Sequence, residues 1–232
     1  MVTPDIRGLG GYSMIRFFFA LFAVGAYTTF FATFLYLIAF VGNYPGAPAT
    51  VDRNITSDVL PALLVNTLLI SLFGLQHSIM ARQGFKTTWT KIVPVPIERS
   101  AYVFLSSAAL ILMFIFWRPI EGNIWQVENQ VGAMILWAVF GFGWLTVLVS
   151  TFLINHFELF GLSQVYRHWR GQSAAEPQFR QPFLYRLVRH PIYSGFIIAF
   201  WATPVMTYGH LLFAIGMTVY ILIGIRDRKS VV

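Results

Sequence analysis

The sequence predicts an all-α, polytopic integral membrane protein, and three observations support this. Hydrophobic residues make up 57% of the chain and charged residues only 11%. The hydrophobic residues come in long uninterrupted blocks, and short segments rich in either bases or acids alternate between them. A soluble chain of 232 residues would have to cover its core with charge, which 16 basic and 9 acidic residues cannot do. We therefore expect a single membrane domain over residues 1–232.

Five apolar stretches define the expected spans. Stretches 17–41, 59–81, 101–117 and 131–154 carry no charge and approach the roughly 20 residues that cross a bilayer. The fifth, 192–225, would be about 50 Å long as one straight helix, well beyond a hydrocarbon core of about 30 Å. Pro204 and Tyr208-Gly209 lie near its middle and favour a turn. We expect a bent or re-entrant helical hairpin, with arms too short to cross independently unless they tilt.

The charged segments predict the topology. Segments 1–16, 82–100 and 155–191 have net charges of +1, +3 and +3, whereas 42–58 and 118–130 each have −1. Basic loops face the cytoplasm. The tail after Ile225 has a net charge of +2, so both termini are expected in the cytoplasm of a bacterial inner membrane.

Composition also excludes several functions. The chain has no cysteine, which excludes disulfides, thiolate metal sites and a cysteine nucleophile, and we expect no metal cofactor. Membrane topology explains the net charge of +7 better than nucleic-acid binding does. No internal repeat of the kind found in many transporters is visible.

One polar motif opens the predicted hairpin, at residues 189–195. Pro191 suits a first helical turn, and the free N–H groups around it favour a carboxylate or phosphate. Arg189 can grip a carboxylate, His190 can bond a ribose or amine, and Gly195 would let a flat ring approach the backbone. The alternative is a basic flank followed by an ordinary proline helix start.

The pattern Arg-His-Pro-x-Tyr-x-Gly, at Arg189, His190, Tyr193 and Gly195, resembles the signature of a membrane methyltransferase superfamily. That superfamily includes isoprenylcysteine carboxyl methyltransferases and phospholipid methyltransferases. The resemblance implies that these four residues contribute to an S-adenosylmethionine pocket.

A closer resemblance covers nearly the whole chain. Residues 66–82 and 98–102 are similar to the NnrU-like branch, and residues 155–162, 200–204 and 209–211 to bacterial methanethiol S-methyltransferases. This closer resemblance implies that the protein methylates a small volatile thiol, methanethiol, to dimethyl sulfide, and that His156 and Gly161 help bind the cofactor. Members usually have a glutamate pair in the second hairpin arm, but no glutamate follows Glu176 here. Either Asp227 substitutes in part or the C-terminus is truncated or altered.

The acceptor side is predicted on the second span. Asn66 and His77 are eleven residues apart, which returns a helix to nearly the same face. Polar and ionisable groups inside a span are costly, so a functional role is the default. We expect Asn66 to bind substrate and His77 to remove the thiol proton, since little methanethiol is ionised at neutral pH. The alternative for His77 is a histidine satisfied by interfacial water.

Three further residues are candidates. Glu158 and His210 are alternative catalytic groups, although Glu158 could instead form a structural salt bridge. Trp201 is expected to face His210 across the hairpin turn and contact substrate, or to anchor the helix at the interface. Two rival functions stay open: methylation of a lipid or isoprenylcysteine acceptor, and a non-enzymatic NnrU-like membrane protein. The sequence leaves the oligomeric state undetermined.

Overall fold

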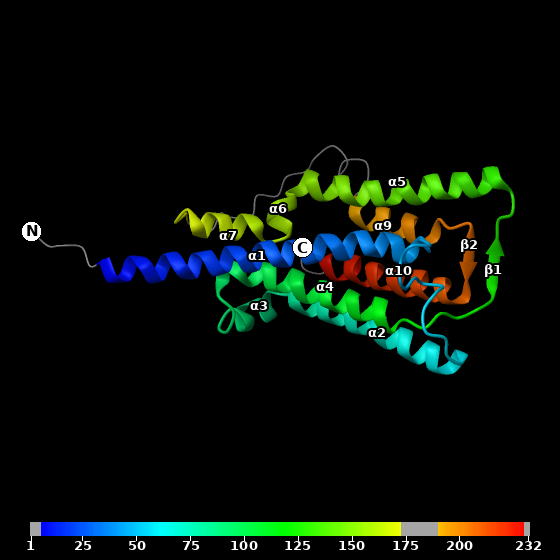
Figure 1. Cartoon of the computed structure of the whole chain (residues 1–232), viewed down its shortest axis with the longest axis horizontal. Helices are drawn as coiled ribbons and strands as arrows, with labels where there is room; N and C mark the ends of the chain where they lie inside the picture. Colours follow the sequence, from blue (N-terminus) through cyan, green and yellow to red (C-terminus); the bar gives the residue numbers. More distant parts are fainter. Residues whose placement is uncertain (1–5, 173–189, 230–232) are drawn as a thin grey trace, which may run out of the picture.

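The computed structural model describes residues 6–172 and 190–229, with side chains described over 14–172 and 190–226. Most of it is helical (Figure 1). The helices are α1 (Ile6–Val41), α2 (Val59–Ala81), α3 (Gln83–Trp89), η1 (Val95–Ile97), α4 (Glu98–Phe116), α5 (Gln130–Ile154), α6 (His156–Leu159), α7 (Leu162–Trp169), α9 (Pro191–Trp201) and α10 (Tyr208–Lys229). Two short strands, β1 (Asn123–Gln126) and β2 (Val205–Thr207), form an antiparallel pair.

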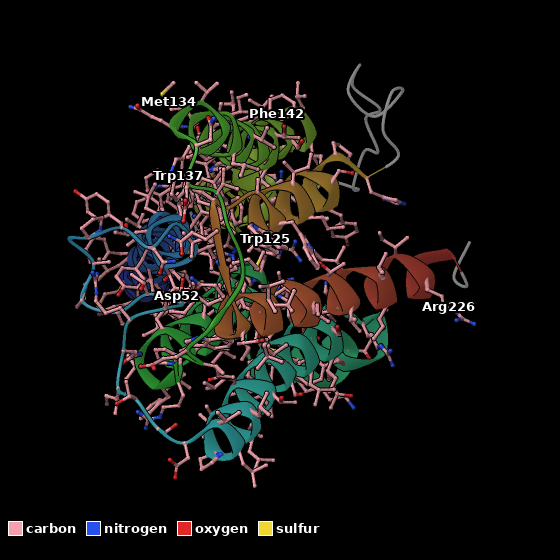
Figure 2. All side chains as sticks on the ribbon, turned by 90° about the vertical axis from the view of Figure 1, so that its right-hand side faces the viewer. Asp52, Trp125, Met134, Trp137, Phe142 and Arg226 are labelled. Atoms are coloured by element: carbon pink, nitrogen blue, oxygen red, sulfur yellow. The ribbon has the colours of Figure 1, made fainter. Side chains whose placement is uncertain are left out.

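The prediction of a polytopic membrane protein is confirmed. Among the described residues, five helices are long and apolar enough to cross a membrane: Met14–Val41, Val59–Ala81, Val95–Phe116, Gln130–Ile154 and Tyr208–Arg226. Their apolar side chains point outward as well as inward. Figure 2 shows Met134 and Phe142 on the outer edge of α5, and both side chains are exposed. Such a surface is stable in lipid, where a helix satisfies its own backbone hydrogen bonds.

The predicted hairpin is present, but its arms are unequal. The first arm, α9, has 11 residues and is too short to cross the bilayer, whereas the second arm, α10, has 22. The expectation that neither arm is long enough is therefore wrong for α10. The turn occupies residues 202–207 and contains β2, so Tyr208 and Gly209 begin α10 instead of forming the bend.

The helices form a ring in the order α1, α4, α2, α10, α9 and α5, which closes where Phe34 of α1 contacts Trp144 of α5. Aromatic residues fill the interior, and Phe40, Trp117, Phe200 and Phe213 are almost fully buried. We call the end of the bundle where α1 begins the N side and the end with β1 and β2 the sheet side (Figure 1). Of the basic segments between helices, 82–100 and the described part of 155–191 lie at the N side, the acidic segments 42–58 and 118–130 lie at the sheet side, and α10 runs back toward the N side.

The sheet side is held by loops that bond to one another. The backbone N–H of Tyr208 donates to Gly122 O, and Gly122 has a φ of +95°, a conformation that favours glycine. The Asp52 carboxylate accepts hydrogen bonds from Asn43 and Thr207, which joins the loop after α1 to the hairpin. These hydrogen bonds fix the loops of the sheet side relative to one another.

Candidate active site

His77 of α2 lies between two hydroxyl groups of α4. Its Nε2 is 2.8 Å from the Tyr102 hydroxyl, and its Nδ1 is 3.2 Å from Ser106 Oγ. With the Ser106 hydrogen assigned to the Tyr102 carbonyl, 2.9 Å away, Ser106 Oγ accepts from His77 Nδ1–H. In this assignment Nε2 carries the lone pair and accepts the Tyr102 O–H, which also lies 3.4 Å from the His77 carbonyl oxygen.

Aromatic rings and one cation surround this pair. The His77 ring centroid is 5.3 Å from that of Phe73 and 6.2 Å from that of Tyr220 on α10. The Arg99 guanidinium lies 5.0 Å from the centre of the Tyr102 ring, and Arg99 Nε donates to the carbonyl that ends α6. Tyr102 is 6% exposed, so the bundle shields its side chain from the surroundings.

A second network of the same kind surrounds His156, just after α5. Its Nε2 is 2.8 Å from the Tyr27 hydroxyl and its Nδ1 is 2.9 Å from Thr151 Oγ1, which itself donates to a backbone carbonyl. The ring stacks on Phe152 at 4.1 Å. Burial lowers the pKa of His156 by desolvating the charged form, so the ring is held neutral.

The short turn after His156 positions two more predicted residues. Glu158 forms an ion pair with Arg167 of α7 at 2.6 Å, which is the structural alternative foreseen for it. Gly161 has a φ of +87° and begins α7. A Cβ at Gly161 would lie 2.8 Å from the Ser100 backbone nitrogen, so the glycine allows this turn to pack against the start of α4.

The motif at the start of α9 is partly described. Arg189 lies outside the described residues, as does the side chain of Asp227. His190 precedes Pro191, the first residue of α9, as the sequence predicts. The His190 and Tyr193 rings are 5.7 Å apart, and both side chains are partly exposed.

Gly195 has a role other than the expected one. A Cβ there would lie 2.8 Å from Gly143 O and 3.0 Å from Val147 N of α5, and a Cβ at Gly143 would lie 2.7 Å from Ala199 N. The face opened by the missing side chain is thus filled by α5 and is not open to a flat ring. The two glycines let α5 and α9 approach closely.

Three predicted residues lie away from the N side. Asn66 is fully buried and bonds both the N–H and the carbonyl of Arg118, which holds the chain where it leaves α4. His210 Nε2 bonds the Phe200 carbonyl at 3.0 Å, and Trp201 Nε1 donates to Thr218, so each has its own partner across the hairpin. These contacts give all three residues a structural role.

The helix register places the start of α9 and the His77 network at a similar depth. Phe200 and His210 meet where α9 and α10 turn back, and the two helices are antiparallel. About ten residues from that contact toward the N side, at 1.5 Å per residue, lie His190 on α9 and Tyr220 on α10. Tyr220 in turn contacts His77. The predicted donor and acceptor residues therefore lie at a similar depth, on the two helices, α9 and α2, that contact α10.

Sequence reasoning missed the hydroxyl partners of both histidines. The sequence indicated Tyr102 only as part of segment 98–102, which resembles the NnrU-like branch. It gave no reason to select Ser106, Tyr27 or Thr151. Tyr102 and Ser106 are four residues apart and so share one helix face, which is a signal the sequence carried. Nothing in the sequence indicated that this face turns toward His77.

Fold and site together define a multi-pass α-helical membrane protein with two hydrogen-bonded histidine networks at one end, one around the half-buried His77 and one around the buried His156. No protein-family model matches the chain, and no solved structure matches it significantly. The search of curated proteins does find relatives.

A methanethiol S-methyltransferase of Mycobacterium tuberculosis is 52% identical over 216 residues, which cover 93% of this chain and 88% of that protein. Methanethiol S-methyltransferase 1 of Bradyrhizobium diazoefficiens is 50% identical over 224 residues, which cover 97% of this chain and 77% of the relative. A nurim homolog of Drosophila pseudoobscura pseudoobscura is 30% identical over 176 residues, covering 73% of this chain and 70% of its own. The chain belongs to the methanethiol S-methyltransferase family.

Proposed function

We propose that this protein transfers a methyl group from S-adenosylmethionine to methanethiol and so forms dimethyl sulfide. The observation that carries the proposal is identity of about half the residues, over more than nine-tenths of the chain, to relatives named for that reaction. The nurim homolog is much less similar to this chain.

The residues at the N side fit the donor molecule. S-adenosylmethionine has adenine and ammonium donors, ribose hydroxyls, a carboxylate and a positive sulfur. Gln76 Oε1, Ser100 Oγ and Gln164 Oε1 are buried and have no hydrogen-bond partner among the described residues, so acceptors are present for such donors. Tyr193 and Tyr220 offer aromatic rings of the kind that stabilise a cation. Arg189 and His190 would bind the carboxylate and ribose, with His156 and Gly161 supporting the turn opposite.

The chain's own residues must align and activate the acceptor. S-adenosylmethionine, when bound, supplies an electrophilic methyl group on positively charged sulfur. The protein must hold the thiol sulfur in line with that methyl, exclude water and take the thiol proton. His77 is the proposed proton acceptor because its Nε2 carries the lone pair.

Methanethiol is small and apolar, so it can reach the bundle from the lipid. The donor is charged and must arrive from water. We propose that the N side faces the cytoplasm of the bacterial inner membrane, because the basic segments lie there. Reporter fusions at both termini test this orientation, and an external reporter at either end would contradict it.

The direct experiment measures dimethyl sulfide in the headspace over purified protein, methanethiol and S-adenosylmethionine. His190→Ala should weaken S-adenosylmethionine binding in calorimetric titration while leaving folding in detergent intact. His168→Ala is the matched control, because His168 also lies at the N side but packs on Phe19 of α1. Unchanged affinity in His190→Ala would remove the cofactor assignment. Methylation of only phospholipid or prenylated acceptors would refute methanethiol as the substrate and keep the methyltransferase.

A further inference from the structure

The tautomer of His77 has a consequence for how the thiol loses its proton. Nδ1 carries a hydrogen that it donates to Ser106, and the Nε2 lone pair already accepts the Tyr102 O–H. A thiol therefore cannot hand its proton to His77 directly unless it displaces Tyr102. The Tyr102 oxygen has two lone pairs of its own and can accept a proton while its hydrogen moves to His77.

We infer that Tyr102 is the catalytic residue that touches the acceptor thiol, and that His77 receives the proton through it. This inference rests on the proposed function and names a second residue for its acceptor step. The thiol S–H proton moves to the Tyr102 oxygen as the Tyr102 hydrogen moves to His77 Nε2. His77 becomes an imidazolium that Ser106 still holds through Nδ1–H.

The methyl transfer then balances. The sulfur lone pair of the thiolate forms a bond to the methyl carbon, and the bond from that carbon to the donor sulfur breaks, with its electron pair going to S-adenosylhomocysteine. The products are dimethyl sulfide, S-adenosylhomocysteine and one proton. After release of dimethyl sulfide, the proton on His77 leaves for water by the reverse path through Tyr102.

Two neighbours of Tyr102 support this step. The Arg99 guanidinium, 5.0 Å from the ring centre, stabilises the negative charge that develops on the ring as its hydrogen leaves. Tyr102 also packs against Met80 and Val103, with Phe160 alongside. This apolar setting suits a small alkanethiol and excludes water from the forming thiolate.

His156 offers a comparison within the same chain. Its contact with Tyr27 has the same length and the same direction of donation. However, Phe152 covers the His156 ring face at 4.1 Å, and Tyr27 belongs to α1, whereas His77 contacts Tyr220 of the hairpin arm α10. The contact with the hairpin arm is the reason for assigning the acceptor thiol to the His77 network.

The test compares two acceptors that differ in acidity. Methaneselenol is a stronger acid than methanethiol and is already ionised at neutral pH, so it needs no proton relay. Tyr102→Phe should lower the rate with methanethiol about 100-fold or more and the rate with methaneselenol less than about threefold, since general-base catalysis contributes about 100-fold to 10,000-fold. His77→Gln should show the same selectivity. Calorimetric affinity for S-adenosylmethionine should stay at the wild-type value in both variants.

Tyr27→Phe removes the matched bond to His156, so any loss it causes should be equal for the two acceptors. ¹⁵N NMR of histidine-labelled protein gives a readout without turnover: Tyr102→Phe should shift the Nε2 resonance of His77 and keep its Nδ1–H. Equal losses with both acceptors in Tyr102→Phe, at unchanged cofactor affinity, would overturn the inference and make Tyr102 structural, while the proposed function would survive. A wild-type protein that methylates neither acceptor would overturn both.

Discussion

The close crossing of α5 and α9 allows a quantitative prediction about what positions the donor site. In Gly195→Val the first added carbon alone would lie 2.8 Å from Gly143 O and 3.0 Å from Val147 N. Both of these atoms belong to the backbone of α5, so the two helices must separate. Overpacking of this kind costs about 1–3 kcal/mol, and we expect about 2–3 kcal/mol because the side chain cannot rotate away from backbone atoms.

Thermal unfolding in detergent measures this cost. A loss of about 2–3 kcal/mol corresponds to a decrease in Tm of about 5–10 °C for a chain of this size. Gly141→Val is the matched control, because Gly141 lies on α5, the helix that Gly195 packs against, and no atom is within 4 Å of a Cβ placed there. Its Tm should stay close to that of the wild type.

The same pair of variants tests the link to function. His190 lies five residues before Gly195, so moving α9 away from α5 should also weaken S-adenosylmethionine binding in calorimetric titration. Gly141→Val should bind normally. If both variants had equal Tm values and equal affinities, the packing of Gly195 against α5 would not position the start of α9, and the reasoning would be refuted.

Three other residues allow shorter tests. Asn66→Leu leaves both backbone groups of Arg118 without their partner and should cost about 2–4 kcal/mol in the free energy of unfolding, and a stability equal to wild type would contradict the buried bonds. The pKa of His156 is lowered by burial, so its contribution to stability is complete above the ordinary histidine value of about 6.5 and is lost as pH falls toward the folded-state pKa. Detergent unfolding between pH 7.5 and 5.5 should therefore show acid destabilisation that shrinks in His156→Gln, and an identical pH slope in the variant would assign the effect elsewhere. Glu158→Gln breaks a partly exposed ion pair with Arg167 and should change stability by less than about 1 kcal/mol, with dimethyl sulfide formation near wild type; a collapse of turnover would restore Glu158 as a catalytic candidate.

The sequence by itself determined the membrane fold. Four predicted spans match helices of the structure to within a few residues, apart from the N-terminal extension of α1, and α2 agrees at both ends. The reason is local: in lipid a helix satisfies its own backbone, so an apolar run of sufficient length is enough to specify a span. The excess length of the fifth stretch predicted a hairpin, but apolar length alone could not divide it into α9 and α10. The pairing of β1 with β2 sets that boundary, and the partners lie about 80 residues apart in the sequence.

The partners of the candidate site residues were decided only by tertiary structure. His77 was found from the sequence because an ionisable group inside a span is costly. Its partner Tyr102 lies 25 residues away, and Tyr27 lies 129 residues from His156. The helical spacing predicted that Asn66 and His77 share one face of α2, yet Asn66 bonds the backbone just after α4 and His77 bonds two hydroxyl groups of α4. Sequence spacing fixes which residues share a face of one helix, whereas the rotation and depth of the neighbouring helix fix what that face meets, and those depend on side-chain packing along the whole bundle.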